Sequence, residues 1–242
     1  MSRYRADDLR VETKPDMTPV SEADQAVELA LRQRLAAARP NDLILGEEFT
    51  EGGAVDAAVG RVWVLDPIDG TKSYIRGMDT WTTLIALVED GDVKVGMVSM
   101  PALRRRWWAT RGEGAFADGR RIHVSGVTEL SAAQLTWSGV EEWDAVEGFD
   151  KLLGLARKCW RSRGVGDAWQ YMLVAEGAAE IAVDPEAMLW DLAAPSIIVQ
   201  EAGGRFSDRG GAEGPGVGMA RGVGSGVASN GWLHAEALAH LG

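Results

Sequence analysis

The chain has 242 residues, of which 46% are hydrophobic and 25% are charged, and its formal net charge is −11. This length allows one large α/β domain with a substantial core, and the negative charge argues against nucleic acids and acidic membrane surfaces as partners. Cys159 is the only cysteine, which excludes an intrachain disulfide and favours a reducing compartment. The N-terminal segment MSRYRADDLR has no apolar core of the signal-peptide type, and no stretch reaches transmembrane length. We therefore expect a soluble cytoplasmic protein.

Histidine is scarce in this sequence. His123, His234 and His240 are scattered without metal-ligand spacing, so histidine metal clusters and Ser-His-Asp catalysis are poorly supported. Any chemistry in this chain is expected to depend on carboxylates.

The first clear helix is expected within residues 18–39. Ser21 suits the N-cap of this helix, and Asp24 stands three residues later in the position of a capping box. An apolar stripe follows at helical spacing, made of Val27, Ala30, Leu31 and Leu35.

Two apolar runs end in acidic residues. A short strand at 43–45 runs into Glu47, and the run at 62–65 stops at Asp66, where the next residue is a proline that removes a backbone donor. Asp66 and Asp69 then lie close together on a turn, where each carboxylate raises the pKa of the other unless a cation neutralises them. An ordinary Asp-Pro, Asp-Gly turn and a solvated strand end would show the same residues.

Helices and strands alternate through the rest of the chain, without a linker between independent domains. A hairpin is expected where Asp90-Gly91 separates apolar runs at 82–89 and 92–100. The later strands are expected at 104–110, 114–124, 134–137, 160–163 and 227–229. The later helices are expected at 144–158, 168–182, 188–201 and 233–241. Residues 209–226 are so rich in glycine that we expect a mobile surface loop.

Acidic residues recur at the ends of these elements. The candidates are Asp24, Glu47, Asp66, Asp69 and Asp191. Asp191 opens a helix, where the helix dipole alone would favour a carboxylate. If the five groups converge in an α/β sandwich, their oxygen atoms form a site for a hard divalent cation, Mg²⁺ first.

Three motifs resemble those of the inositol monophosphatase family of Mg²⁺-dependent, lithium-sensitive phosphomonoesterases. They are GEE at 46–48, DPIDGT at 66–71 and WDLAAPSIIVQEAGG at 190–204, and they occur in the family's order and spacing. The resemblance covers nearly the whole chain and implies a layered αβαβα sandwich, usually assembled as a homodimer.

The same resemblance implies a single phosphatase domain over residues 1–242, built of two interleaved halves at approximately 1–128 and 129–242. The family has a further helix before the segment that matches RADDLRVETKPD. This sequence starts almost at that segment, so we expect that helix to be absent here.

Carried over residue by residue, the resemblance assigns Glu47 to a first metal and makes Asp66 a bridge between two metals. Asp69 and Asp191 complete the second metal, and the backbone carbonyl of Ile68 is a further ligand of the first. The implied cofactor is Mg²⁺, two or three ions per site, with Mn²⁺ as a substitute.

The resemblance also assigns roles around the reacting phosphate. Thr71, paired with Asp24 and assisted by Glu47, matches the family's arrangement for positioning the attacking water. Backbone N–H groups of Gly70 and Thr71 would hold the phosphate. Lys14 matches a basic position that helps to set a metal-bound water, although a solvated loop lysine would show the same pattern.

The substrate is a small phosphate ester whose alcohol half is expected to contact Asp167, Ala168 and Asp184. An inositol-specific enzyme typically has a small uncharged residue where Asp167 stands. Two carboxylates here suit a substrate with a positive amine and an imidazole. The segments GDAWQYMLVAEG and PALRRRWWATRGEGAF resemble the histidinol-phosphate phosphatase branch of the family, which implies hydrolysis of L-histidinol phosphate in histidine synthesis. Asp167 could instead cap the helix that opens at Ala168.

Two kinds of alternative stay open. Within the phosphatase class, the substrate could be inositol 1-phosphate or a sugar phosphate, whereas a 3′-phosphoadenosine nucleotide is disfavoured because Asp167 would repel a second phosphate. From another class, the chain could be a non-catalytic phosphate-ester sensor, against which the intact set of acidic residues argues.

Overall fold

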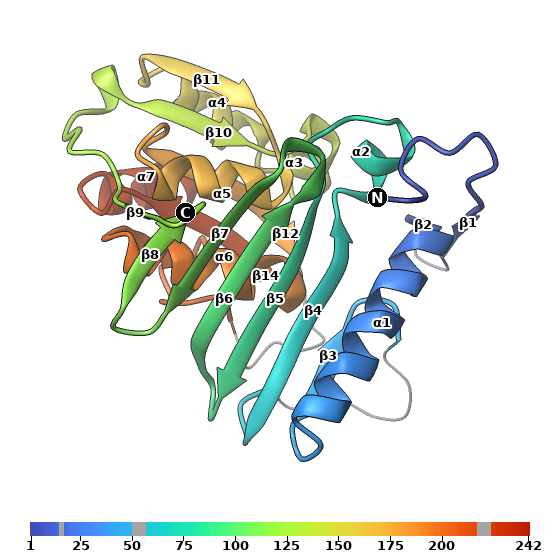
Figure 1. The fold of residues 1–242 in the computed structure, drawn as a ribbon. Helices are drawn as coiled ribbons and strands as arrows, with labels where there is room; N and C mark the ends of the chain where they lie inside the picture. The colour runs from blue at the N-terminus through green and yellow to red at the C-terminus, as the bar shows by residue number, and fades with distance from the viewer. Residues whose placement is uncertain (15–16, 50–56, 217–223) are drawn as a thin grey trace.

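The computed structural model describes residues 1–14, 17–49, 57–216 and 224–242 (Figure 1). Two β-sheets dominate this part of the chain. The larger sheet has seven strands, which pair in the order β3 (Leu43–Gly46), β4 (Arg61–Asp69), β5 (Thr82–Glu89), β6 (Asp92–Met100), β7 (Arg105–Thr110), β8 (Gly114–Ala117) and β9 (Arg120–Ile122). β3 and β4 are parallel and the other neighbours are antiparallel.

The expected hairpin forms between β5 and β6. Asp90 and Gly91 have φ angles of 50° and 84°, the left-handed values that a tight hairpin turn requires at both central positions. The sequence prediction of this hairpin is confirmed.

The smaller sheet has five strands from the second half of the chain. They pair in the order β11 (Arg161–Gly164), β10 (Gln134–Trp137), β12 (Ile181–Ala187), β14 (Gly224–Ser229) and β13 (Arg205–Ser207). β10 is parallel to both of its neighbours, so β10, β11 and β12 end at the same edge of the sheet. A two-stranded ribbon of β1 (Val11–Thr13) and β2 (Pro19–Ser21) lies apart from both sheets.

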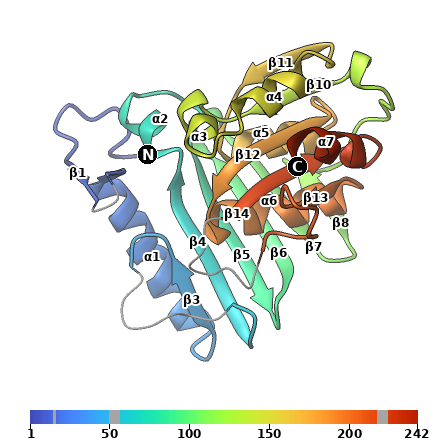
Figure 2. The ribbon, with the colours of Figure 1, turned by 180° about the vertical axis from the view of Figure 1, so that it is seen from behind.

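Helices alternate with the sheets, as Figures 1 and 2 show. α1 (Glu22–Ala38) packs against β4 in one outer layer. α5 (Asp167–Ala175) and α6 (Leu189–Glu201) contact strands of the smaller sheet, and α6 also contacts the larger one. The other outer layer contains α3 (Val140–Ala145), α4 (Phe149–Ala156) and α7 (His234–Leu241). The expected αβαβα sandwich is confirmed.

The largest core lies around α6, between the sheets. Ile197, Ile198 and Val199 are completely buried, and the core combines them with strand residues such as Val64 and Phe206. Because α6 is apolar on nearly every side, it suits a layer that is covered from two directions. Among the described residues, no helix combines the length and apolar character needed to span a membrane.

The apolar stripe expected on α1 is confirmed only in part, because Val27, Leu31 and Leu35 are half-buried but none of the stripe is fully buried. Ser21 and Asp24 form the predicted capping box, but the buried residues of the helix are Ala23, Asp24 and Glu28. Ala30, expected in the stripe, is exposed. The carboxylates of Asp24 and Glu28 instead point inward, because Asp24 accepts a hydrogen bond from Thr71 at the start of α2 (Thr71–Ile75) and Glu28 accepts one from the segment after β3.

Two other predicted helices are shorter in the structure. The helix expected over 144–158 is interrupted at Glu147, whose φ is 53°. The helix expected over 168–182 ends at Ala175, and Gly177, with φ of 73°, turns the chain towards Ile181 at the start of β12. An apolar run in a buried strand cannot be told from a buried helix by periodicity alone, which explains the second error.

Other boundaries differ less. The last strand begins at Gly224 instead of residue 227, and part of the glycine-rich segment 209–226 lies outside the described residues. The strand expected to stop at Asp66 continues as β4 to Asp69, with a shift in its pairing to β5 between these two residues.

Candidate active site

A cavity of about 460 Å³ lies where strand ends of both sheets meet the starts of α2 (Thr71–Ile75), α5 and α6. Its lining is strongly acidic. The carboxylate residues that line it are Glu47, Asp66, Asp69, Glu141, Glu142, Asp167, Asp184, Glu186 and Asp191. Lys72 also lines the cavity. An anion could enter such a space only after much of this negative charge is neutralised.

Three of these carboxylates converge. Asp66 and Asp69 come from the bulged end of β4, and Asp191 comes from the first turn of α6. Each offers an oxygen atom within 4.8 Å of the other two. Oδ1 of Asp66 is buried and has no hydrogen-bond partner, so it is available to a cation.

Burial and mutual repulsion make the three groups hard to ionise together. Burial, followed by the charges of Glu47 and Asp69, raises the pKa of Asp66 well above its usual range. Burial and the charge of Asp69 raise the pKa of Asp191 to about 8. Burial raises the pKa of Asp69 to about 6, although two hydrogen bonds to its carboxylate oppose the shift. A buried set of carboxylate oxygens with these properties fits a hard divalent cation.

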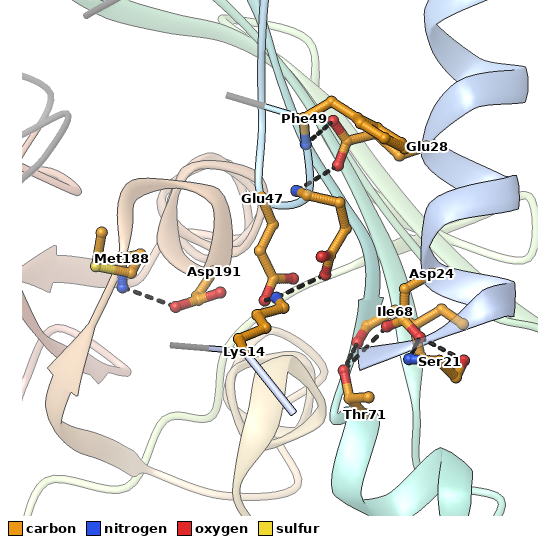
Figure 3. A network of polar contacts seen from close by, with 11 residues as sticks. Lys14, Ser21, Asp24, Glu28, Glu47, Phe49, Ile68, Thr71, Met188 and Asp191 are labelled. Carbon is orange, nitrogen blue, oxygen red and sulfur yellow. Dashed lines mark hydrogen bonds and ion pairs between the residues drawn. The ribbon is translucent and has the colours of Figure 1, made fainter. Parts of the chain in front are cut away.

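The surrounding backbone fixes two of these side chains. Oδ2 of Asp69 accepts hydrogen bonds from the Thr82 hydroxyl at 2.7 Å and from the backbone N–H of Ala168 at 2.9 Å. Oδ2 of Asp191 accepts the backbone N–H of Met188 at 2.7 Å (Figure 3). These hydrogen bonds all go to Oδ2, so they fix the orientation of each carboxylate and leave its Oδ1 outside them.

Glu47 lines the same cavity but is held by a lysine. Nζ of Lys14 lies 2.7 Å from Oε1 of Glu47 and 2.7 Å from Oε1 of Glu48 (Figure 3). Burial lowers the pKa of Lys14, but the hydrogen bonds to both glutamates outweigh burial and raise it overall. Lys14 is thus an ion-pair partner of Glu47 and not a solvated loop lysine.

Thr71 and Asp24 meet beside the converging carboxylates. The Thr71 hydroxyl lies 3.1 Å from Oδ1 of Asp24 and 2.9 Å from the carbonyl oxygen of Ile68, and it can donate its single proton to one of them at a time. Oδ2 of Asp24 accepts hydrogen bonds from the backbone N–H and the hydroxyl of Ser21. The capping box of α1 therefore orients the carboxylate that faces Thr71.

The turn at Gly70 leads directly into α2. Gly70 has φ of 80°, a conformation that glycine adopts without strain, and the first amides of a helix have no partner within it. A Cβ atom at Gly70 would lie 2.7 Å from Oδ2 of Asp167, so this carboxylate lies directly against the turn. Asp167 itself has φ of 52°, and the start of α5 has no side-chain cap hydrogen bond.

Asp167 and Asp184 form a second acidic group in the lining of the same cavity. Oδ2 of Asp184 accepts a hydrogen bond from the Tyr171 hydroxyl at 2.6 Å, and burial raises the pKa of Asp184 to about 7. Burial and nearby carboxylates raise the pKa of Asp167, and Glu142 contributes to the shift of both aspartates. Glu142 lines the same cavity as these two aspartates.

Sequence reasoning missed Glu142 and Tyr171. Glu142 follows β10 by a few residues, as Glu47 follows β3, so a search for acidic residues after every strand would have found it. No comparable signal marks Tyr171, whose role depends on where Asp184 lies.

The family model described as the inositol monophosphatase family matches residues 1–241. The chain belongs to the inositol monophosphatase family. Curated relatives include the histidinol-phosphatase of Mycobacterium tuberculosis, 50% identical over 99% of this chain and 90% of the relative, and that of Streptomyces coelicolor, 49% identical over 100% and 90%. An IMPase structure from Thermotoga maritima superposes with a TM-score of 0.84 at 30% identity, over 99% of this chain and 89% of the other. As an inositol monophosphatase family member, the chain has the fold and the acidic cavity expected from its motifs.

Proposed function

We propose that this protein hydrolyses L-histidinol phosphate to L-histidinol and phosphate, as a step of histidine biosynthesis. The observation that carries the proposal is the second acidic group, made of Glu142, Asp167 and Asp184, in the same cavity as the converging carboxylates. A phosphate ester of a cationic amine and imidazole would match this charge pattern, since each carboxylate can accept a charge-assisted hydrogen bond. Two relatives named histidinol-phosphatase, each about half identical over nearly the whole chain, support the same substrate.

The proposed cofactor is Mg²⁺, in two or three ions, with Mn²⁺ as a substitute. Asp66, Asp69 and Asp191 would hold it together with Glu47 and the carbonyl of Ile68, and the free Oδ1 of Asp66 supports this choice. When bound, the cation supplies the positive charge that the phosphate needs and that activates a water molecule. Lys14 already holds Glu47 and would also help to place a water at this end of the site.

Thr71 and Asp24 are proposed to orient the attacking water. When the Thr71 hydroxyl donates to Oδ1 of Asp24, its oxygen is left to accept a hydrogen bond from the water. Glu47 is the proposed base that assists. The water would give one proton to Glu47 as its oxygen bonds to phosphorus. The ester P–O bond breaks, and the leaving alkoxide oxygen takes up one proton from Glu47 or from solvent, so that no proton is gained or lost overall.

The two ends of the substrate would then be held by different residues. Amides of Gly70 and Thr71 would bind phosphate oxygens at the turn before α2. Asp167, beside Ala168 at the start of α5, and Asp184 would bind the amine and the imidazole. Asp167 lies between these two ends, so it would favour an ester whose positive group is close to the phosphate.

We further propose a cytoplasmic homodimer. The single cysteine suits a reducing compartment, and the assembly follows the family resemblance. Sedimentation analysis of the purified chain tests the assembly, and a monomer at micromolar concentration would contradict it.

Phosphate release from L-histidinol phosphate, inositol 1-phosphate and adenosine 3′,5′-bisphosphate, measured side by side with Mg²⁺, tests the function. We expect kcat/KM for L-histidinol phosphate to exceed that for inositol 1-phosphate at least about tenfold, because each charge-assisted hydrogen bond contributes about 1.5–3 kcal/mol. Equal or faster hydrolysis of inositol 1-phosphate would indicate a broad monophosphatase. Binding without turnover of any ester would indicate a sensor.

A further inference from the structure

Glu28 is a buried carboxylate outside the cavity. It lies on α1 four residues after Asp24, on the same face of the helix, and its relative exposure is 0%. A charged side chain in this position is costly unless its hydrogen bonds are satisfied. Its partners therefore indicate what it does.

The partners of Glu28 are backbone amides just beyond β3. Oε2 accepts the N–H of Glu48 at 2.8 Å, and Oε1 accepts the N–H of Phe49 at 3.2 Å (Figure 3). Arg32, one turn further along α1, donates from Nε to Oε1 of Glu28 at 2.7 Å and also donates to the carbonyl oxygen of Phe49. Through Glu28 and Arg32, helix α1 thus forms hydrogen bonds with two amides and one carbonyl of the segment that carries Glu47.

The residue at position 46 permits this approach. A Cβ atom on Gly46 would lie 2.1 Å from Oε1 of Glu28, so any larger residue would displace the carboxylate. Glu47 follows immediately, and its own N–H bonds the carbonyl of Leu65 at 3.2 Å. Residues 46 to 49 are therefore held by the sheet on one side and by Glu28 on the other.

We propose that Glu28 and Arg32 are positioning residues for the metal ligand Glu47. They fix the backbone from which Glu47 and Glu48 project, so that both side chains point at Lys14 and Glu47 reaches the cavity. One helix then sets two parts of the site, since Asp24 orients Thr71 and Glu28 sets the exit of β3. The inference rests on the metal-ligand role proposed above for Glu47, but it does not depend on the identity of the ester.

The test is the affinity of the full-length, metal-free protein for Mg²⁺ alone, measured by isothermal titration calorimetry for E28Q, R32M and the control R34M. In E28Q the new side-chain NH₂ group replaces an acceptor, so it must face a donor, either a backbone N–H or the guanidinium of Arg32. In R32M the carboxylate of Glu28 loses its ion-pair partner. Arg34 is exposed on the same helix, so R34M removes the same charge without touching the segment. Circular dichroism and thermal unfolding report whether each variant is folded at the titration temperature.

We expect E28Q and R32M, while folded, to bind Mg²⁺ about tenfold or more weakly, as is typical when the partner of a ligand is lost, and R34M to bind like the parent protein. If E28Q does not fold, R32M alone decides. Folded variants with parental affinity would overturn the proposal. Loss of folding in both variants would overturn it too, because the pair would then support the fold instead of the ligand. No substrate is present, so failure of the histidinol phosphate assay leaves this result unaffected.

Discussion

The carboxylate of Asp69 accepts a hydrogen bond of 2.9 Å from the backbone N–H of Ala168, which joins the end of β4 to the first turn of α5 across 99 positions of the sequence. The peptide that donates this bond links Ala168 to Asp167. One peptide therefore ties a candidate metal ligand to a candidate substrate residue. This contact couples the position of Asp69 to the start of α5, so small movements of α5 should affect both residues.

Replacement of Asp66 by asparagine should nearly abolish phosphate release. The substitution removes the negative charge and replaces one of the two carboxylate oxygens by an NH₂ group, with a loss of several kcal/mol of charge stabilisation, so kcat should fall by roughly a hundredfold or more. The fold should persist, because a neutral amide relieves repulsion among three crowded carboxylates. The exposed Asp92→Asn variant is the control, and steady-state assays with parallel melting curves give the answer. Full activity in Asp66→Asn would remove the metal assignment.

Replacement of Asp167 by asparagine should change which ester is preferred. Loss of the charge removes a charge-assisted hydrogen bond to a cationic substrate, so kcat/KM for L-histidinol phosphate should fall about tenfold to a hundredfold. Inositol 1-phosphate has no cationic group and should lose far less, or even gain, because the carboxylate beside Gly70 no longer repels its phosphate. The ratio of the two kcat/KM values is the measurement. Equal losses of kcat/KM for both esters would show that Asp167 does not distinguish substrates by their alcohol part.

Glu142 offers a milder version of the same experiment. It is half-buried and lines the same cavity as Asp167 and Asp184, whereas its neighbour Glu141 is exposed. Glu142→Gln should raise KM for L-histidinol phosphate by about threefold to tenfold, the effect of losing one partly screened charge, with little change in kcat. Glu141→Gln is the matched control and should have a smaller effect. A larger effect from Glu141 would place the cationic group nearer the mouth of the cavity.

The sequence was most informative where a motif and a strand end coincide. Asp66, Asp69 and Asp191 could be singled out because each stands next to a residue that breaks or starts an element, and the structure brings these three together. The layered fold followed from the alternation of elements and from the family resemblance. The pairing of Lys14 with Glu47 was not predicted, since Lys14 was expected only to help to set a metal-bound water.

Other parts depended on tertiary contacts that leave no local pattern. The first two residues of β12, Ile181 and Ala182, were taken for the end of a helix because both are buried, and the rest of the strand was not predicted. Asp184-Pro185 in this strand nevertheless repeats the Asp66-Pro67 pattern of β4. Glu28 was overlooked because the helix was expected to bury apolar residues. Glu28 points inward because it binds the amides of Glu48 and Phe49, which lie 20 and 21 positions further along the chain. A search for helical periodicity covers shorter stretches than this and does not detect such a contact.

The buried histidine His234 should make the protein less stable in mild acid. The Ser229 hydroxyl accepts a hydrogen bond from the N–H of Gly231 and is left to donate its proton to Nδ1 of His234. The Ser207 hydroxyl donates to the carbonyl oxygen of Asp208 and accepts a hydrogen bond from Nε2–H of His234, so the neutral imidazole satisfies both serines. Burial lowers the pKa of His234 to about 4. Below about pH 6.5 the histidine is therefore protonated in the unfolded chain but stays neutral in the folded chain until the pH approaches 4. This contribution, about 2–3 kcal/mol, is present above pH 6.5 and is lost as pH falls towards 4. Urea unfolding between pH 7 and pH 4 measures it, and His234→Gln should flatten the slope; an unchanged slope would contradict the assignment.

The carboxylate cluster should produce the opposite trend in the metal-free protein. The pKa values of Asp69 and Asp191 are raised to about 6 and about 8, so the folded chain holds protons that the unfolded chain releases near pH 4. Stability from these groups is complete below pH 4 and is lost as pH rises through 6 and 8. Mg²⁺ should restore it where the groups are ionised. At a concentration 100 times its Kd, Mg²⁺ should raise Tm by about 5–10 °C at pH 8 and by clearly less at pH 5.5, where protons compete for the same oxygens.

Thermal unfolding with and without Mg²⁺ at these two pH values separates this effect from that of His234, which does not depend on the metal. Asp191→Asn is the informative variant, because it removes the group with the pKa of about 8 and one of the three converging oxygens. Its metal-free form should melt at least as high as the parent at pH 8, and its response to Mg²⁺ should nearly vanish. An equal rise in Tm at both pH values in the parent protein would mean that Mg²⁺ binds elsewhere. The acidic cavity would then be a site for the cationic part of a substrate alone.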